Sequence, residues 1–193
     1  MVGPAFVVVA YLMGSVCFGL VVAAHHGVDL RGTGSGNVGA TNVGRLLGRR
    51  TGRLVLVLDA AKGLLPTLGA HMLLGRQDPW TAATGLAASL GHCYPIWFRF
   101  KGGKAAATAA GALLAVTPGA GAAAIATYVG LKKWTRRASV GSLAGGLIGA
   151  LVSAALDGPR ATSTQMAVAL WVLLLWRHRD NLRRLARGEE PPS

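Results

Sequence analysis

Residues 31–42, with the sequence RGTGSGNVGATN, form a glycine-rich polar segment that could bind an anion. Glycine lets the backbone adopt positive φ angles, so that successive N–H groups point at one anion. Hydroxyl and amide side chains add donors, and the planar guanidinium of Arg45 matches the oxygens of a phosphate group. We therefore expect a phosphate site formed by Gly34, Ser35, Gly36, Asn37, Gly39, Thr41, Asn42 and Arg45.

The spacing Gly34-x-Gly36-x-x-Gly39 also matches the fingerprint of dinucleotide-binding proteins, with Asp59 at the distance expected for their ribose-binding acid. That fingerprint requires a short strand before it and a strand–helix–strand unit around it. Here a long uncharged run precedes the glycines and a second apolar run follows them. The sequence therefore favours a phosphate-binding loop over a dinucleotide site.

A second polar segment, residues 91–104 (GHCYPIWFRFKGGK), leads directly into an apolar stretch that starts at Ala105. A helix beginning there places the ammonium groups of Lys101 and Lys104 beside free backbone N–H groups and the positive end of the helix dipole. This arrangement attracts anions, and membrane anchoring alone does not require the paired glycines. The predicted substrate-binding residues here are Lys101, Gly102, Gly103 and Thr108, and Lys104 is predicted to be catalytic.

Two further pairs of polar residues have helical spacing. His178 and Asn181 lie three apart after the last apolar run, on one helix face, and we expect them to orient a phosphate substrate. Asp59 and Lys62 are also three apart, inside an apolar run where inserting either charge costs about 2.5–3.5 kcal/mol. They could pair with each other or act directly in the chemistry, and the residues alone leave both open.

The rest of the chain is strongly apolar: hydrophobic residues make up 52%, charged residues 14%, and the mean hydropathy is +0.45. The net charge of +13 is typical of nucleic-acid-binding proteins, but here apolar runs separate the basic clusters. A membrane protein with basic loops explains both features, so no nucleic-acid partner is expected. The apolar runs are residues 2–24, 54–75, 80–98, 105–131, 138–156 and 161–176.

The run 105–131 contains a turn signal at Pro118-Gly119, and the distribution of basic residues shows how to interpret it. A hairpin at Pro118 places seventeen lysines and arginines in cytoplasmic segments and two outside, whereas a single crossing gives nine and ten. Because basic residues concentrate on the cytoplasmic side, the hairpin is favoured. We expect one all-α integral-membrane domain over residues 1–193, with seven transmembrane helices, some short, the N-terminus outside and the C-terminus cytoplasmic. The cytoplasmic segments are 25–53, 99–104, 132–137 and 177–193.

Four stretches together resemble the bacterial membrane glycerol-3-phosphate acyltransferase family that uses acyl phosphate as its donor. They are residues 34–45 (GSGNVGATNVGR), 59–63 (DAAKG), 91–108 (GHCYPIWFRFKGGKAAAT) and 178–190 (HRDNLRRLARGEE), so the likeness runs nearly end to end. The chain departs from the family at Ala105, where glycine is usual, and at Cys17, where proline is usual. Arg137-Ala138-Ser139 replaces a Tyr-Ser-Ser type segment, which leaves the roles of Ser139 and Ser142 open.

The resemblance implies an enzyme of phospholipid synthesis in the bacterial inner membrane, with its active site facing the cytoplasm. It implies that the 1-hydroxyl of glycerol 3-phosphate attacks the acyl carbonyl of acyl phosphate, giving lysophosphatidate and phosphate. The partners are thus the two substrates and membrane lipid, with no cofactor or metal, and the expected state is a monomer. The expected catalytic residues are Ser35, Arg45, Lys104, His178 and Asn181.

Several alternatives stay open at this point. The proton acceptor is either His178 or a substrate phosphate, and the residues do not assign each phosphate to a patch or predict the acyl-chain length. A small anion transporter would also place helix N-termini at an anion, although its site would lie near the membrane midplane. A nonenzymatic lipid-binding protein does not explain the spaced Ser, Asn and Thr donors.

Overall fold

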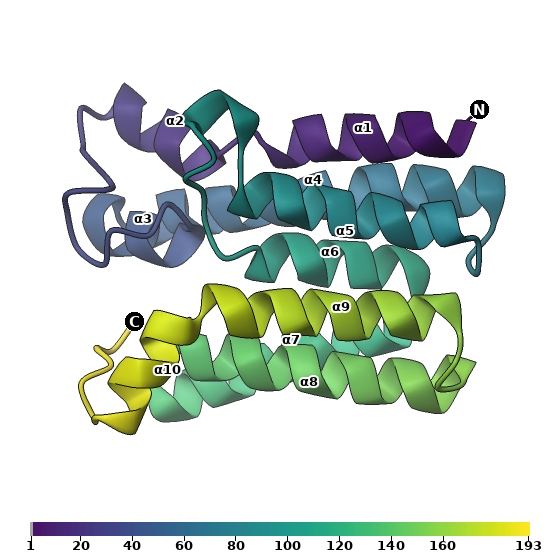
Figure 1. Cartoon of the computed structure of the whole chain (residues 1–193). Coiled ribbons are helices and arrows are strands. Elements are labelled where there is room, and N and C mark those ends of the chain that lie inside the picture. Colours follow the sequence, from purple (N-terminus) through teal and green to yellow (C-terminus); the bar gives the residue numbers. More distant parts are fainter. Residues whose placement is uncertain (1) are drawn as a thin grey trace.

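The structure, a computed structural model, describes residues 2–193 as α-helices joined by short loops (Figure 1). Most of these helices coincide with the predicted apolar runs, because a helix satisfies its own backbone hydrogen bonds within a membrane. The helices are α1 (Val2–Gly14), α2 (Phe18–His25), α3 (Ala40–Leu47), α4 (Arg49–Leu74), α5 (Pro79–Cys93), α6 (Ala106–Val116), α7 (Pro118–Thr135), α8 (Ala138–Asp157), α9 (Thr162–Arg177) and α10 (Arg179–Ala186), with a 3-10 turn at Ile96–Phe98.

The long helices form two groups, one with α1, α4, α5 and α6 and the other with α7, α8 and α9 (Figure 1). The chain passes between the groups at Thr117, which separates α6 from α7. Pro118 starts α7, a position where the missing N–H of proline leaves no helical hydrogen bond unmade. The predicted turn at Pro118 is therefore confirmed, and run 105–131 is two helices.

The first apolar run is not one continuous helix as predicted, because it breaks between Gly14 and Phe18. The break leaves the carbonyl of Val16 without a helical partner, and the ammonium of Lys62 on α4 donates a 2.7 Å hydrogen bond to it. A free carbonyl in an apolar setting is costly, so a buried lysine stabilises this break. Local sequence gives no sign of that long-range partner.

Three stretches are long and apolar enough to cross a membrane by themselves, namely Val2–His25, Arg49–Leu74 and Ala138–Asp157, counting the first as one span despite its break. α6 is apolar but shorter, and run 80–98 ends as an α-helix at Cys93 before the 3-10 turn. Length alone therefore identifies only part of the bundle as membrane-spanning.

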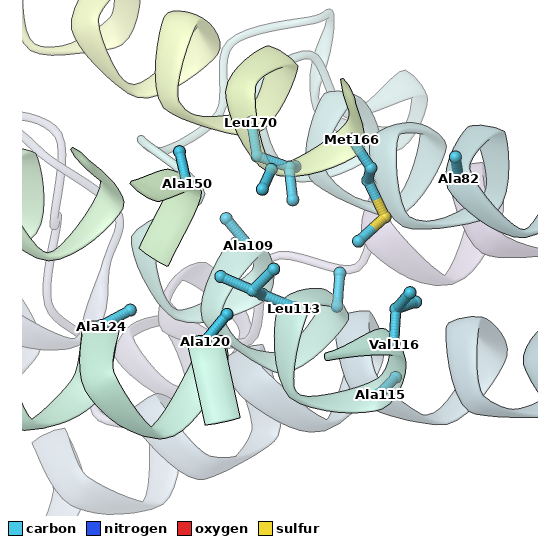
Figure 2. Close-up of a cluster of buried hydrophobic side chains, with 12 residues drawn as sticks. Ala82, Ala109, Leu113, Ala115, Val116, Ala120, Ala124, Ala150, Met166 and Leu170 are labelled. Atoms are coloured by element: carbon cyan, nitrogen blue, oxygen red, sulfur yellow. The ribbon is translucent and has the colours of Figure 1, made fainter. Parts of the chain in front are cut away.

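Small residues allow the helices to pack closely. A methyl group at Gly63 on α4 would collide with the backbone oxygen of Thr108 on α6. Gly145 on α8 faces the backbone oxygen of Ala124 on α7 in the same way, and Gly149 faces the side chain of Leu113 on α6. A buried cluster of alanines with Leu113, Val116, Met166 and Leu170 joins the two groups of helices (Figure 2). The glycine-rich pattern thus serves packing, as is usual in membrane bundles.

Candidate active site

One cavity of about 380 Å³ opens at the end of the bundle that carries α3, α10 and the loop before α6. We call this end the basic end, because Arg45, Lys104 and Arg184 line the cavity there. Its other polar lining side chains come from segments far apart in the sequence, so only the fold brings them together. They are Ser35, Asn37, Thr41, Asp59, His92, Ser139, Ser142, His178, Asn181, Glu190 and Ser193.

The glycine-rich loop is shaped by Asn42, which is fully buried. Its side-chain oxygen accepts a 3.0 Å hydrogen bond from the Ser35 N–H, and its amide donates to the carbonyls of Leu30 (3.2 Å) and Thr33 (3.1 Å). Gly34 and Gly36 have φ angles of +66° and +67°, which confirms the predicted need for glycine at these positions. Asn42 therefore organises the loop from behind, while neighbouring polar side chains face the cavity.

The Gly102-Gly103 pair is held on both sides by the protein itself. The two N–H groups donate to the carbonyls of Cys93 (3.2 Å) and His92 (3.0 Å) at the end of α5. The guanidinium of Arg177 donates to the carbonyls of Gly102 (3.2 Å) and Gly103 (3.0 Å). Both N–H groups are therefore hydrogen-bonded within the protein and cannot bind an anion. The same bonds fix the backbone that precedes Lys104.

Lys104 begins a chain of polar contacts that joins three parts of the fold. Its ammonium donates a 2.6 Å hydrogen bond to the side-chain oxygen of Asn181, whose amide donates at 2.6 Å to Glu190. The Glu190 carboxylate also accepts from Ser139 (2.7 Å) and Arg184 (2.8 Å). Burial, and then the positive charge of Arg184, lower the pKa of Lys104 to about 8.

His178 lies at the junction of α9 and α10 and is almost completely buried. Its Nδ1 lies 2.8 Å from the carbonyl oxygen of Leu174, so Nδ1 carries the proton and Nε2 is an acceptor. Burial, and then the charge of Lys104, lower the pKa of His178 to about 4. The imidazole is therefore neutral at physiological pH.

The Asp59–Lys62 pair is confirmed, with 2.9 Å between carboxylate and ammonium. Asp59 also faces His92, whose Nδ1 is 3.6 Å away, and both side chains reach the cavity wall. The imidazole of His92 packs against Gly103, where any side chain would collide with it. The buried cluster of Asp59, Lys62 and His92 thus packs against the backbone next to Lys104 through His92.

The remaining cavity wall is apolar and extends inward between the two groups of helices. It is formed by Ala106, Ala109 and Leu113 of α6, Ala124 and Ile125 of α7, Gly145 and Gly146 of α8, and Ala167, Leu170 and Trp171 of α9, with further residues of α4. One cavity therefore joins a cationic, hydrogen-bonding mouth to an apolar interior.

The sequence model of the family described as glycerol-3-phosphate acyltransferase matches residues 4–188 of the chain. The chain belongs to this family. A glycerol-3-phosphate acyltransferase of Geobacter sulfurreducens is 47% identical over 94% of this chain and 93% of its own length. The one of Aquifex aeolicus is 44% identical over 95% of each chain.

Two solved structures of PlsY, an integral membrane glycerol 3-phosphate acyltransferase, are similar to this acyltransferase over its whole length. The glycerol 3-phosphate form has a TM-score of 0.96 at 41% identity and is covered to 96%. The lysophosphatidic acid form has a TM-score of 0.94 at 40% identity and is covered to 95%. The family model, the curated relatives and the two solved structures therefore all indicate a glycerol-3-phosphate acyltransferase that is an integral membrane protein.

In this acyltransferase, the fold brings about half of the predicted site residues to the cavity. Asn42 is buried behind the loop, Lys101 is exposed, and Thr108 is fully buried against α4. The predicted residues that line the cavity are Ser35, Asn37, Gly39, Thr41, Arg45, Lys104, His178 and Asn181. Those that do not line it are Gly34, Gly36, Asn42, Lys101, Gly102, Gly103 and Thr108.

Apart from Asp59, whose role was left open, several polar residues of the cavity were not predicted as site residues, among them His92, Ser139, Ser142, Arg184, Glu190 and Ser193. Arg184 follows His178 and Asn181 at the same three-residue spacing, so helical periodicity could have indicated it. Ser139 and Ser142 are likewise three apart on α8. Glu190 lies beyond α10, and no local spacing indicates that its chain folds back onto Asn181.

Proposed function

We propose that this acyltransferase moves an acyl group from acyl phosphate to the 1-hydroxyl of glycerol 3-phosphate, giving lysophosphatidate and inorganic phosphate. The observation that carries the proposal is the single cavity that joins cationic and hydrogen-bonding groups to an apolar interior. Both substrates carry a phosphate, and one also carries an acyl chain. The glycerol 3-phosphate and lysophosphatidic acid forms of PlsY support the same acceptor and product.

The lining residues divide into two anion-binding groups. Ser35, Asn37, Thr41 and Arg45 of the glycine-rich loop and α3 hold one phosphate, and Lys104, His178, Asn181 and Arg184 hold the other. Each group combines a cation with neutral donors, as phosphate recognition requires. Lys101 is exposed outside the cavity, so Lys104 and Arg184 neutralise charge in its place.

The reaction needs positioning more than strong acid catalysis, because acyl phosphate is an activated anhydride with a good leaving group. The glycerol oxygen bonds to the acyl carbon, the bond from that carbon to the phosphate oxygen breaks, and phosphate leaves. Holding two anions together contributes about 7–11 kcal/mol through orientation, and fixed donors stabilise the developing oxyanion. The hydroxyl proton passes to Nε2 of neutral His178 or to a substrate phosphate.

We also propose seven membrane crossings, with the N-terminus outside and the cavity mouth facing the cytoplasm from the inner membrane. The support is the placement of the basic loops together at the basic end, as the positive-inside rule requires. A cysteine introduced at Gly119, beyond the α6–α7 turn, should then react with an impermeant reagent added outside cells. Reaction from the cytoplasmic side alone would contradict this topology.

The transporter alternative loses support at the other end of the bundle. There the buried carboxylate of Asp157 accepts hydrogen bonds from Ser163 (2.7 Å) and Thr117 (2.9 Å) and pairs with Arg76 (3.0 Å). These contacts tie together the turns after α4, α6 and α8. The residues that line the cavity stop short of these turns, whereas a transporter must reach its site from both sides.

The decisive experiment measures phosphate release by the purified protein in detergent with palmitoyl phosphate and glycerol 3-phosphate. Release should depend on both substrates, and its absence would overturn the proposal. Lys104→Ala and Arg45→Ala should each lower kcat/KM at least about 100-fold, as lost transition-state contacts do. Lys101→Ala is the matched control, since this lysine lies in the same segment outside the cavity, and its activity should stay within about threefold of wild type.

A further inference from the structure

The apolar part of the cavity is a wedge between α6 and the group of α7, α8 and α9. α6 and α7 meet at Thr117, while Lys104 before α6 and Arg137 after α7 are both linked to Glu190 at the basic end. The cavity lining on α6 runs from Ala106 to Leu114 and does not reach Thr117, so the wedge is open at the polar mouth and closed near the α6–α7 turn. A chain that starts at the reacting carbonyl can extend only toward that narrow end or out into the membrane.

The wedge is about as deep as one leaflet of a membrane. On α9 its lining runs from Ala167 to His178, which is about 16 Å at 1.5 Å of rise per residue. Half of a hydrocarbon core of about 30 Å is about 15 Å. An acyl chain that fills one leaflet can therefore lie along this wall with its end near Leu113 and Ala167.

Leu113 forms the floor of the wedge. It lines the cavity, yet it belongs to the buried core with Ala109, Ala120 and Leu170 around it (Figure 2). A Cβ atom built on Gly149 would lie 2.7 Å from Cδ2 of Leu113, so this leucine rests directly on the glycine.

The cavity lining on α8 confirms where the wedge ends. Gly145 and Gly146 are lining residues, whereas Gly149, one turn further along the helix, is not. Below the floor, Val116 and Ala150 are buried and pack in the same cluster. The contact between Leu113 and Gly149 therefore separates the open wedge from the closed core.

We propose that Leu113, seated on Gly149, limits the length of the acyl chain that this enzyme accepts. The inference rests on the proposed function, because it takes the acyl chain of the donor as the occupant of the wedge. The wedge is continuous with the cationic mouth, so a donor whose phosphate binds there must direct its chain toward this floor or leave the protein. Acyl chains that are too long then collide with Leu113, in the way that an apolar pocket discriminates between substrates that differ by one methylene.

Two substitutions should shift the length preference in opposite directions. Gly149→Ala puts a methyl group where Leu113 now rests, and the leucine tip, which can rotate, moves up into the wedge. Leu113→Ala removes the floor and opens the space toward Ala120 and Ala150. The first change shortens the wedge and the second lengthens it.

The experiment measures kcat/KM for saturated acyl phosphates from decanoyl to octadecanoyl, with glycerol 3-phosphate in excess. Relative to wild type, Gly149→Ala should lower the ratio of the longest to the shortest donor about tenfold, and Leu113→Ala should raise it by a similar factor. Val55→Ala is the matched control, because it removes buried apolar volume from a separate cluster and should leave the ratio unchanged.

The outcomes separate this inference from the proposed function. If wild type is active and both variants keep its length profile, the floor assignment is wrong and the acyltransferase proposal stands. If wild type releases no phosphate from any donor, the proposed function itself fails. Should Gly149→Ala not fold, Leu113→Ala alone decides, and an unchanged or shortened preference in that variant overturns the inference.

Discussion

The ammonium of Lys104 and the side-chain oxygen of Asn181 are joined by a 2.6 Å hydrogen bond between residues 77 positions apart. The other end of the same amide donates to Glu190, which fixes which way the amide of Asn181 points. Asn181 therefore couples a cation from the start of α6 to a carboxylate beyond α10. This coupling holds Lys104 at the cavity wall before any substrate arrives.

Replacing Asn181 tests this coupling. Asn181→Ala leaves the buried charges of Lys104 and Glu190 without their shared partner, so kcat/KM should fall about 100-fold. The free energy of unfolding should fall by about 1–3 kcal/mol for the same reason. Asp180→Ala is the control, because this exposed neighbour makes only a surface contact with Arg183 and its loss should change neither quantity. Full activity in Asn181→Ala would show that Lys104 needs no such support.

The lowered pKa of Lys104 predicts how activity depends on pH. The ammonium form binds phosphate, and burial and Arg184 make it lose its proton near pH 8, well below the usual range. The kcat/KM for glycerol 3-phosphate should therefore decline as the pH rises through about 8. Lys104→Arg keeps the charge at all accessible pH values, so whatever its absolute activity, its profile should lack this decline. A decline of equal size in both enzymes would assign the titration to another group.

The residues after Glu190 contact Arg45, whose guanidinium donates to the carbonyl of Pro192. Ser193 in turn donates from its N–H and hydroxyl to the carbonyl of Arg136, at 2.6 and 3.1 Å. Because the Pro192 carbonyl competes with a substrate phosphate for Arg45, deleting residues 191–193 should lower the KM of one substrate about three- to tenfold, equivalent to about 0.7–1.4 kcal/mol. The kcat should stay constant, since the contact affects only the free enzyme.

Ser193→Ala serves as the control for that deletion. It removes the hydroxyl contact with Arg136 but keeps the Pro192 carbonyl, so both KM values should match wild type. A raised KM in the deletion variant would mean that these residues help to hold substrate instead of competing with it.

Two glycine substitutions should change the melting temperature in opposite directions, because Gly63 lies between α4 and α6 whereas Gly130 of α7 faces open space. Gly63→Ala forces a methyl group into the backbone oxygen of Thr108, so the helices must separate and the melting temperature in detergent should fall. Gly130→Ala places a methyl group in open space within α7. It should stabilise the helix by about 0.5–1 kcal/mol, because alanine loses less backbone entropy than glycine. Equal melting temperatures for the two variants would refute this account of the interface.

Sequence patterns predicted the helices well where the cause is local. The turn at Pro118 and the three-residue spacing of His178 and Asn181 depend on neighbours along the chain, and the structure agrees with both. Apolar length located most of the helices, but it did not show the break after Gly14 or the end of α5 at Cys93. The glycines at 34 and 36 likewise take the positive φ angles expected of them. Ala105 has a φ of +59°, a backbone conformation that glycine adopts more readily than alanine.

Tertiary structure decided which polar groups of these segments stay free, because residues distant in the sequence form hydrogen bonds with the others. The N–H groups of Gly102 and Gly103 look free at a helix start, but the end of α5 binds them. The first apolar run looks continuous, but Lys62 of α4 stabilises a break within it. Hydrogen bonds and close packing between residues far apart in the chain have no local signature. Composition and spacing therefore determined a membrane protein with polar, basic loops, and the fold decided which atoms of these loops face the cavity.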